Sequence, residues 1–87
     1  MKIEIRSSFT KASKKLPAQY QQKIAEIIEQ IEDEKTIREI SNCKKLTGYK
    51  TTYRIKLKIY RIGFFYEKEV VELTTVLHRK EIYRYFP

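Results

Sequence analysis

The segment YRIKLKIYRI, residues 53–62, carries three cations that could act on a phosphate: Arg54, Lys56 and Arg61. Gathered on one surface, such side chains attract and bind an anionic ligand. A lysine within a cluster of cations can also act as a base, since neighbouring positive charges lower the pKa of an ammonium group. These residue types therefore predict a site that binds an anion such as a phosphate.

The three cations share a surface only if the chain turns between them. Apolar residues alternate at odd positions before the turn and at even positions after it. A hairpin with Lys58 and Ile59 as its loop removes this change of phase, because it sets Lys56 opposite Arg61 and Arg54 opposite Gly63. The other face of the hairpin is then apolar and can pack on a core. Its residues are Tyr53, Ile55, Leu57, Tyr60, Ile62, Phe64 and Tyr66.

Like charges directly opposite each other on a sheet are unfavourable by tenths of a kcal/mol, and a bound anion would reverse that sign. Two structural explanations remain open for this basic face. Lysine and arginine discourage pairing between sheet edges, and their aliphatic stems can cover apolar surface.

A second turn, at Lys68 and Glu69, returns the segment VVELTTVLH as a third strand. Regular alternation predicts Val71, Leu73, Thr75 and Leu77 on the core face, and Glu72, Thr74, Val76 and His78 on the basic face. His78 would then lie beside the cations, although a shift of one residue would send it to the core.

The preceding residues supply the elements that must support this sheet. Residues 2–6 alternate as a short strand, and Ser7 or Ser8 can cap a helix that includes Phe9. Pro17 separates this helix from a second one, predicted from Ala18 to about Glu34. Residues 36–48 are read as a helical turn and a loop. The second helix has an apolar stripe formed by Tyr20, Ile24, Ile27, Ile28 and Ile31.

The C-terminal tail mixes cations with aromatic residues, and a terminal turn or short helix is expected there. Such a mixture stacks on nucleobases and holds phosphates. The alternative is that Tyr83 and Phe86, three residues apart, form a packing pair. The residues of this mixture are Arg79, Lys80, Tyr83, Arg84, Tyr85 and Phe86.

The charge of the chain favours a polyanionic partner. The 87 residues carry a net charge of +8 and are expected to form a single domain. Residues 1–40 hold eight Lys/Arg and seven Asp/Glu, whereas residues 41–87 hold eleven and four. A basic half of this kind attracts nucleic acid, although net charge can also serve solubility.

Several other chemistries find no support in the residues. Cys43 is the only cysteine and His78 the only histidine, so no thiolate cluster, paired-histidine metal site or Ser/His/Asp arrangement is available. We therefore expect no metal and no cofactor. There is no apolar run typical of a signal peptide or a membrane span, and we expect a cytoplasmic protein without a membrane partner.

Four motifs, KKLTG, YRIKL, YRIGFFYE and VLHRKEIYRYF, stand in the order and spacing of RelE-like toxins. The chain resembles the RelE/ParE toxin superfamily of toxin–antitoxin pairs over nearly its whole length. The resemblance implies an α+β fold: an N-terminal strand, two antiparallel helices and a three-stranded antiparallel meander, with the helices on one face of a four-stranded sheet. It thus implies one RelE-like toxin domain, residues 1–87.

The resemblance also implies an activity: cleavage of mRNA in the ribosomal decoding site, without metal, by attack of a ribose 2′-OH on the adjacent phosphate. Lys56 would help to remove the 2′-OH proton, Arg61 would hold the phosphate, and Arg54 would add positive potential. His78 is assigned to protonate the leaving 5′ oxygen. The further candidates are Arg79 to orient the phosphate, Tyr83 to stack on the nucleotide, and Lys45, Lys58, Lys80, Arg84 and Tyr85 to bind RNA.

Two other functions remain open on the sequence. A ParE-like protein would share the fold but inhibit DNA gyrase without cutting RNA, and a noncatalytic module would bind RNA through the same basic face. The expected partners are a cognate antitoxin in a hetero-oligomer, the mRNA and ribosomal RNA.

Overall fold

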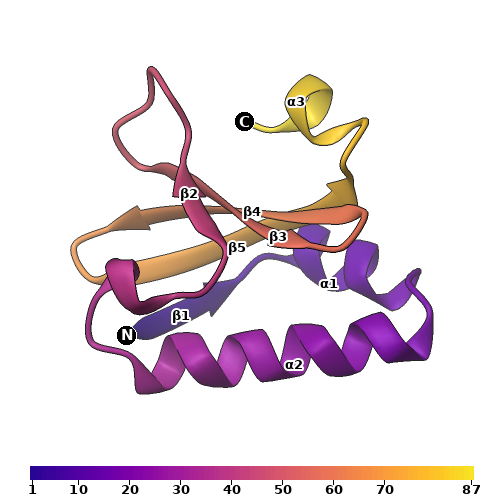
Figure 1. Cartoon of the computed structure of the whole chain (residues 1–87), viewed down its shortest axis with the longest axis horizontal. Helices are drawn as coiled ribbons and strands as arrows, with labels where there is room; N and C mark the ends of the chain where they lie inside the picture. The colour runs from indigo at the N-terminus through magenta and orange to yellow at the C-terminus, as the bar shows by residue number, and fades with distance from the viewer.

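The computed structural model describes residues 1–87 and contains one mixed sheet with the strand order β1-β5-β4-β3-β2 (Figure 1). Helices α1 and α2 lie on one face of the sheet, and α3 lies on the other. None of the helices combines the length and the apolar character needed to cross a membrane. The elements are β1 (Lys2–Ile5), α1 (Ser7–Lys14), α2 (Ala18–Asp33), the 3₁₀ turn η1 (Ile37–Glu39), β2 (Cys43–Lys45), β3 (Thr52–Leu57), β4 (Tyr60–Glu67), β5 (Val70–His78) and α3 (Ile82–Tyr85).

The predicted α+β class and the order of the elements are confirmed, including the return of β1 to the sheet, where it runs parallel to β5. The predicted number of four strands is wrong. The fifth strand, β2, lies in the segment read as a loop and pairs with β3. Because β2 spans only three residues, it is too short for alternation to reveal it.

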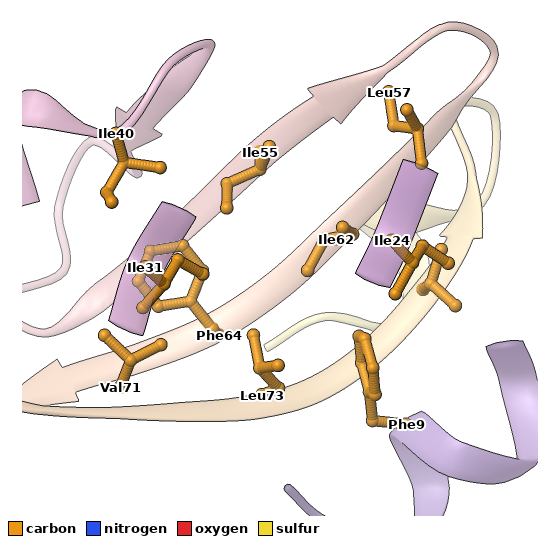
Figure 2. Packing of buried hydrophobic residues seen from close by; sticks show 11 residues of the cluster. Phe9, Ile24, Ile31, Ile40, Ile55, Leu57, Ile62, Phe64, Val71 and Leu73 are labelled. Atoms are coloured by element: carbon orange, nitrogen blue, oxygen red, sulfur yellow. The ribbon is translucent and has the colours of Figure 1, made fainter. Parts of the chain in front are cut away.

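The core lies between the sheet and the two long helices. Helix α1 contributes Phe9, and the stripe of α2 contributes Ile24 and Ile31, all three buried. Figure 2 shows these side chains in one cluster with residues of the β3, β4 and β5 strands. Burial of this apolar face supplies the driving force that holds the sheet on the helices. The strand residues of the cluster are Ile55, Leu57, Ile62, Phe64, Val71, Leu73 and Val76.

The predicted hairpin is confirmed residue by residue. Lys56 pairs with Arg61 and Arg54 with Gly63, with Lys58 and Ile59 between the strands. Lys58 takes a positive φ of 56°, in the left-handed region that tight hairpin turns use. The apolar residues predicted for the core face are on that face.

The predicted register of β5 holds for its first half and is wrong for its second half. Gly63 pairs with Thr75, while Phe64 pairs with Leu73, so Thr74 is an extra residue in a β-bulge. The phase of the strand reverses beyond the bulge. Val76, predicted on the basic face, is buried in the core.

His78 is moved by the same bulge. It pairs with Tyr60 on the helix side of the sheet, at a ring-centroid distance of 6.1 Å. Tyr60 in turn packs against Tyr20 of α2. The predicted position of His78 beside the cations is therefore wrong, and Leu77, predicted in the core, takes the place opposite Arg61.

The serine predicted to cap α1 has another role. The residue at the cap position is Arg6, and no side chain caps the helix. The Ser8 hydroxyl instead donates a hydrogen bond to the carbonyl oxygen of Thr74 at the bulge. This contact ties α1 to the place where β5 changes phase.

The register of β5 can be tested with valine variants. Val76→Ala should lower the free energy of unfolding by about 2 kcal/mol, because it removes two buried methylene equivalents and leaves a cavity. Val71→Ala, at an equally buried site, should cost about the same, and Val70→Ala, at a half-buried site, should cost less. Urea unfolding followed by circular dichroism measures all three. A cost for Val76→Ala no larger than that for Val70→Ala would contradict the bulge.

Candidate active site

The cations lie in two rows across the face of the sheet opposite α1 and α2. Lys44 of β2 pairs with Arg54 of β3, and Lys56 of β3 pairs with Arg61 of β4. Arg54 and Lys56 alternate with buried core residues, which is why their side chains leave the sheet on the other side. We call this surface the basic face.

A cleft of about 390 Å³ opens on the basic face. Lys56 is exposed there, whereas Arg54 and Arg61 are half-buried. The cleft thus brings together the three cations predicted from the hairpin and adds Tyr83 from the tail. Its lining residues are Asn42, Cys43, Lys44, Arg54, Lys56, Arg61 and Tyr83.

Arg61 is held in place by the turn of its own hairpin. Its Nη1 atom donates hydrogen bonds to the carbonyl oxygens of Lys58, at 2.7 Å, and Tyr60, at 2.9 Å. Its Nε and Nη2 groups have no partner in the protein and can donate to a phosphate. Burial lowers the pKa of this guanidinium, and the positive charges of Arg54 and Arg79 lower it further.

No carboxylate neutralises this group of cations. The one ion pair of the structure joins Arg6 to Glu72, at 3.1 Å. Repulsion among the cations is therefore not compensated within the protein, and after burial it contributes to the lowered pKa of Arg61. An anion bound in the cleft would relieve that repulsion.

Gly63 makes the place where the tail docks. A β-carbon at this position would lie 2.7–2.8 Å from the ring of Phe86, closer than real contacts allow. Phe86 is buried over the glycine and also packs against Phe65 of β4, with ring centroids 5.3 Å apart. Ile82 of α3 is buried as well. Because Gly63 has no side chain, Phe86 can pack over it and α3 can dock on the basic face.

Docked in this way, α3 carries Tyr83 to the cleft. The Tyr83 side chain is 69% exposed, and Cζ of Arg54 lies 4.7 Å from the centroid of its ring. Nη1 of Arg54 also donates a hydrogen bond to the Tyr83 hydroxyl. The Phe86 ring packs on Phe65 and Gly63, whereas the Tyr83 ring lies against Arg54, so the alternative that Tyr83 and Phe86 form a packing pair is wrong.

Two predicted catalytic residues remain, Arg79 and His78, and only the first lies near the cations. Arg79 is exposed beside the hairpin turn, where its backbone N–H donates to the carbonyl of Ile59 at 2.7 Å, and its charge reaches Arg61. His78 is outside the site. Its Nδ1 atom accepts a hydrogen bond from the backbone N–H of Lys80, and a nitrogen that accepts in this way carries no proton.

The residues predicted to bind RNA are all exposed. Lys45 lines a second cleft next to the first, together with Arg54 and Tyr83. The other four line neither cleft; they are Lys58 at the hairpin turn and Lys80, Arg84 and Tyr85 in the tail.

Three residues that line the first cleft were missed by the sequence reasoning: Asn42, Cys43 and Lys44. The KKLTG motif pointed to this region, but without β2 nothing placed Lys44 opposite Arg54. Burial raises the pKa of the Cys43 thiol to about 11, so it is protonated at neutral pH and is a poor nucleophile.

The chain is similar to several known proteins over at least nine-tenths of its length. Toxin RelE3 of Methanocaldococcus jannaschii is 35% identical, with all of both chains covered. The RelB-RelE antitoxin-toxin complex of Methanococcus jannaschii contains a chain that is 33% identical, with a TM-score of 0.81 and 95% of this chain and 98% of that chain covered. The RelE-RelB complex of Pyrococcus horikoshii contains a chain that is 24% identical, with a TM-score of 0.72 and with 90% of this chain and 93% of that chain covered. No family model matches the sequence.

The docking of the tail can be tested at Gly63. Gly63→Ala should lower the free energy of unfolding by about 1–3 kcal/mol, because its methyl group overlaps the Phe86 ring. Combined with Phe86→Ala, which removes that ring, the glycine substitution should cost much less. Urea unfolding of the single and double variants measures this coupling. Strictly additive losses in the free energy of unfolding would contradict the docking of the tail at Gly63.

Proposed function

The chain belongs to the RelE toxin family, and from this premise we propose that it is an endoribonuclease that cuts mRNA in the ribosomal decoding site and so inhibits translation. One observation carries the proposal. Arg54, Lys56, Arg61 and Tyr83 line a single open cleft, and no carboxylate neutralises the cations. A face of this kind fits a phosphodiester better than an uncharged ligand.

Lys56 is the proposed base. It is exposed in the cleft, where a ribose can approach its amine. The amine takes the proton of the 2′-OH, and the 2′ oxygen attacks the adjacent phosphorus. A bond forms between the 2′ oxygen and phosphorus as the bond to the 5′ oxygen of the next nucleotide breaks. The products are a 2′,3′-cyclic phosphate and a free 5′-OH end.

Arg61 is the proposed phosphate ligand. The hairpin turn holds its Nη1, which leaves Nε and Nη2 to donate to the phosphate oxygens as negative charge develops there. Arg54 and Arg79 add positive potential at Arg61. Tyr83, fixed on Arg54, stacks on or orients the nucleotide.

Protonation of the leaving 5′ oxygen is not assigned to His78, because that residue lies on the far side of the sheet. The donor belongs among the groups of the basic face.

A cognate antitoxin is the proposed protein partner, in a toxin–antitoxin hetero-oligomer. The similar chain from Methanococcus jannaschii is part of such a complex. An acidic segment that covers the basic face would neutralise the cations and close the cleft at the same time. Action on ribosomes places the proposed activity in the cytoplasm, with mRNA and ribosomal RNA as the other partners.

The roles of Lys56 and Arg61 predict large losses of activity. Lys56→Ala and Arg61→Ala should each lower the rate of cleavage of ribosome-bound mRNA by about 10² to 10³, the usual cost of one transition-state contact. Lys56→Arg keeps the charge but not the base, so it should stay well below the wild-type rate. Mapping of RNA ends on programmed ribosomes measures these rates.

The control is Lys11→Ala, which removes an exposed cation from α1 on the opposite face. It should cut at the wild-type rate, and all variants should keep the wild-type melting temperature. Wild-type speed for Arg61→Ala would show that its assignment is wrong. Inhibition of gyrase supercoiling by the wild-type protein, without new RNA ends, would favour a ParE-like activity instead.

A further inference from the structure

A second cleft, of about 320 Å³, lies beside the first between the loop after β2 and the C-terminal tail. Figure 1 shows this loop and α3 rising from the same face of the sheet, opposite α1 and α2. We call this hollow the aromatic cleft. Its lining residues are Lys44, Lys45, Leu46, Thr47, Tyr49, Arg54, Tyr83, Phe86 and Pro87.

The two clefts share three residues: Lys44, Arg54 and Tyr83. The stacked pair of Arg54 and Tyr83 forms a common wall between them. A polymer with a phosphate in the first cleft therefore has the aromatic cleft directly along its path.

The lining of the aromatic cleft suits a nucleobase. Tyr49 is 49% exposed and Tyr83 69% exposed, so rings from both walls are available for stacking. Phe86 gives the cleft apolar surface, and Lys44 and Lys45, which also line it, can hold a phosphate. Aromatic faces combined with cations are the means by which proteins bind unstacked bases of single-stranded RNA.

Tyr49 lies in the loop after β2, and backbone hydrogen bonds hold this loop in its conformation. The N–H of Leu46 donates to the carbonyl of Thr52 at 2.8 Å, and the N–H of Tyr49 donates to the carbonyl of Leu46 at 3.3 Å. Gly48, with a φ of 87°, makes the turn between these bonds. The backbone of Tyr49 is thus held in place before any ligand arrives, which lowers the entropy lost on binding.

We propose that the aromatic cleft is a subsite for the base of a nucleotide next to the scissile phosphate. Tyr49 stacks on that base, and Lys44 and Lys45 hold the phosphate of the same nucleotide. This inference rests on the proposed function and adds to it a residue that determines sequence preference. The occupant is RNA, because the wall shared with the first cleft continues the path of the same strand.

The test compares Tyr49→Ala, Tyr49→Phe and Ile5→Ala on programmed ribosomes whose decoding-site codon carries each of the four bases at each position. For Tyr49→Ala, KM should rise about tenfold to a hundredfold, with kcat little changed and the differences between bases reduced. Tyr49→Phe keeps the ring and should behave as wild type. Ile5→Ala, which removes a side chain of similar exposure at the opposite edge of the sheet, should also do so.

A binding experiment separates this subsite from the proposed function. Short oligonucleotides with 2′-deoxyribose next to the target phosphate cannot be cut, and fluorescence anisotropy gives their affinity for the free protein. Loss of the neighbouring base, in an abasic oligonucleotide, should weaken binding to the wild type about tenfold or more and to Tyr49→Ala hardly at all.

Each result bears on one of the two proposals. If the wild type cuts and Tyr49→Ala keeps its KM and its base preference, the subsite is overturned and the proposed function stands. If the wild type cuts nothing, the proposed function fails, and the abasic comparison alone decides the subsite. A Tyr49→Ala variant that loses only affinity for the antitoxin overturns the subsite as well.

Discussion

The pairing of β3 with β4 across a two-residue turn is the constraint on which the rest of the structure depends. It brings two apolar faces, out of phase in the chain, onto one side of the sheet, and their burial against α1 and α2 drives the fold. The same pairing places Lys56 against Arg61 on the other side. Because the apolar face has to be buried, the cations must all lie on the basic face. The repulsion between them is the energetic cost of that arrangement.

The absence of one side chain then decides how the tail completes this face. Gly63 follows Arg61 by two residues on β4 and leaves a hollow that Phe86 fills. Helix α3 has only four residues, too few to hold itself together in isolation, so its position comes from Phe86 and Ile82. Tyr83 reaches Arg54 as a consequence. The site thus depends on packing as much as on charge.

The β-bulge at Thr74 separates two roles that a regular strand would have mixed. Before the bulge, β5 contributes Val71 and Leu73 to the core; after it, Val76 takes over that role and His78 joins the aromatic contacts of Tyr60. The face near the hairpin turn keeps Arg61 opposite the apolar Leu77. A titratable imidazole is thereby kept away from the phosphate ligand, and the chemistry of the proposed site is left to lysine, arginine and tyrosine.

Alternation and turn chemistry were sufficient to predict the hairpin, the core face and the convergence of Arg54, Lys56 and Arg61, because these depend on residues that are neighbours in the chain. The β2 strand, the bulge and the docking of α3 could not be obtained in this way. A three-residue strand has no readable period, an extra residue in a strand leaves no mark in its own sequence, and the hollow at Gly63 exists only once Phe86 meets it from 23 residues away. The sequence alone determined four of the five strands and the basic character of the exposed face of the sheet. Only the tertiary structure decided that His78 lies on the far side and that Tyr83 and Tyr49 flank the cations, since those positions follow from contacts between segments distant in the chain.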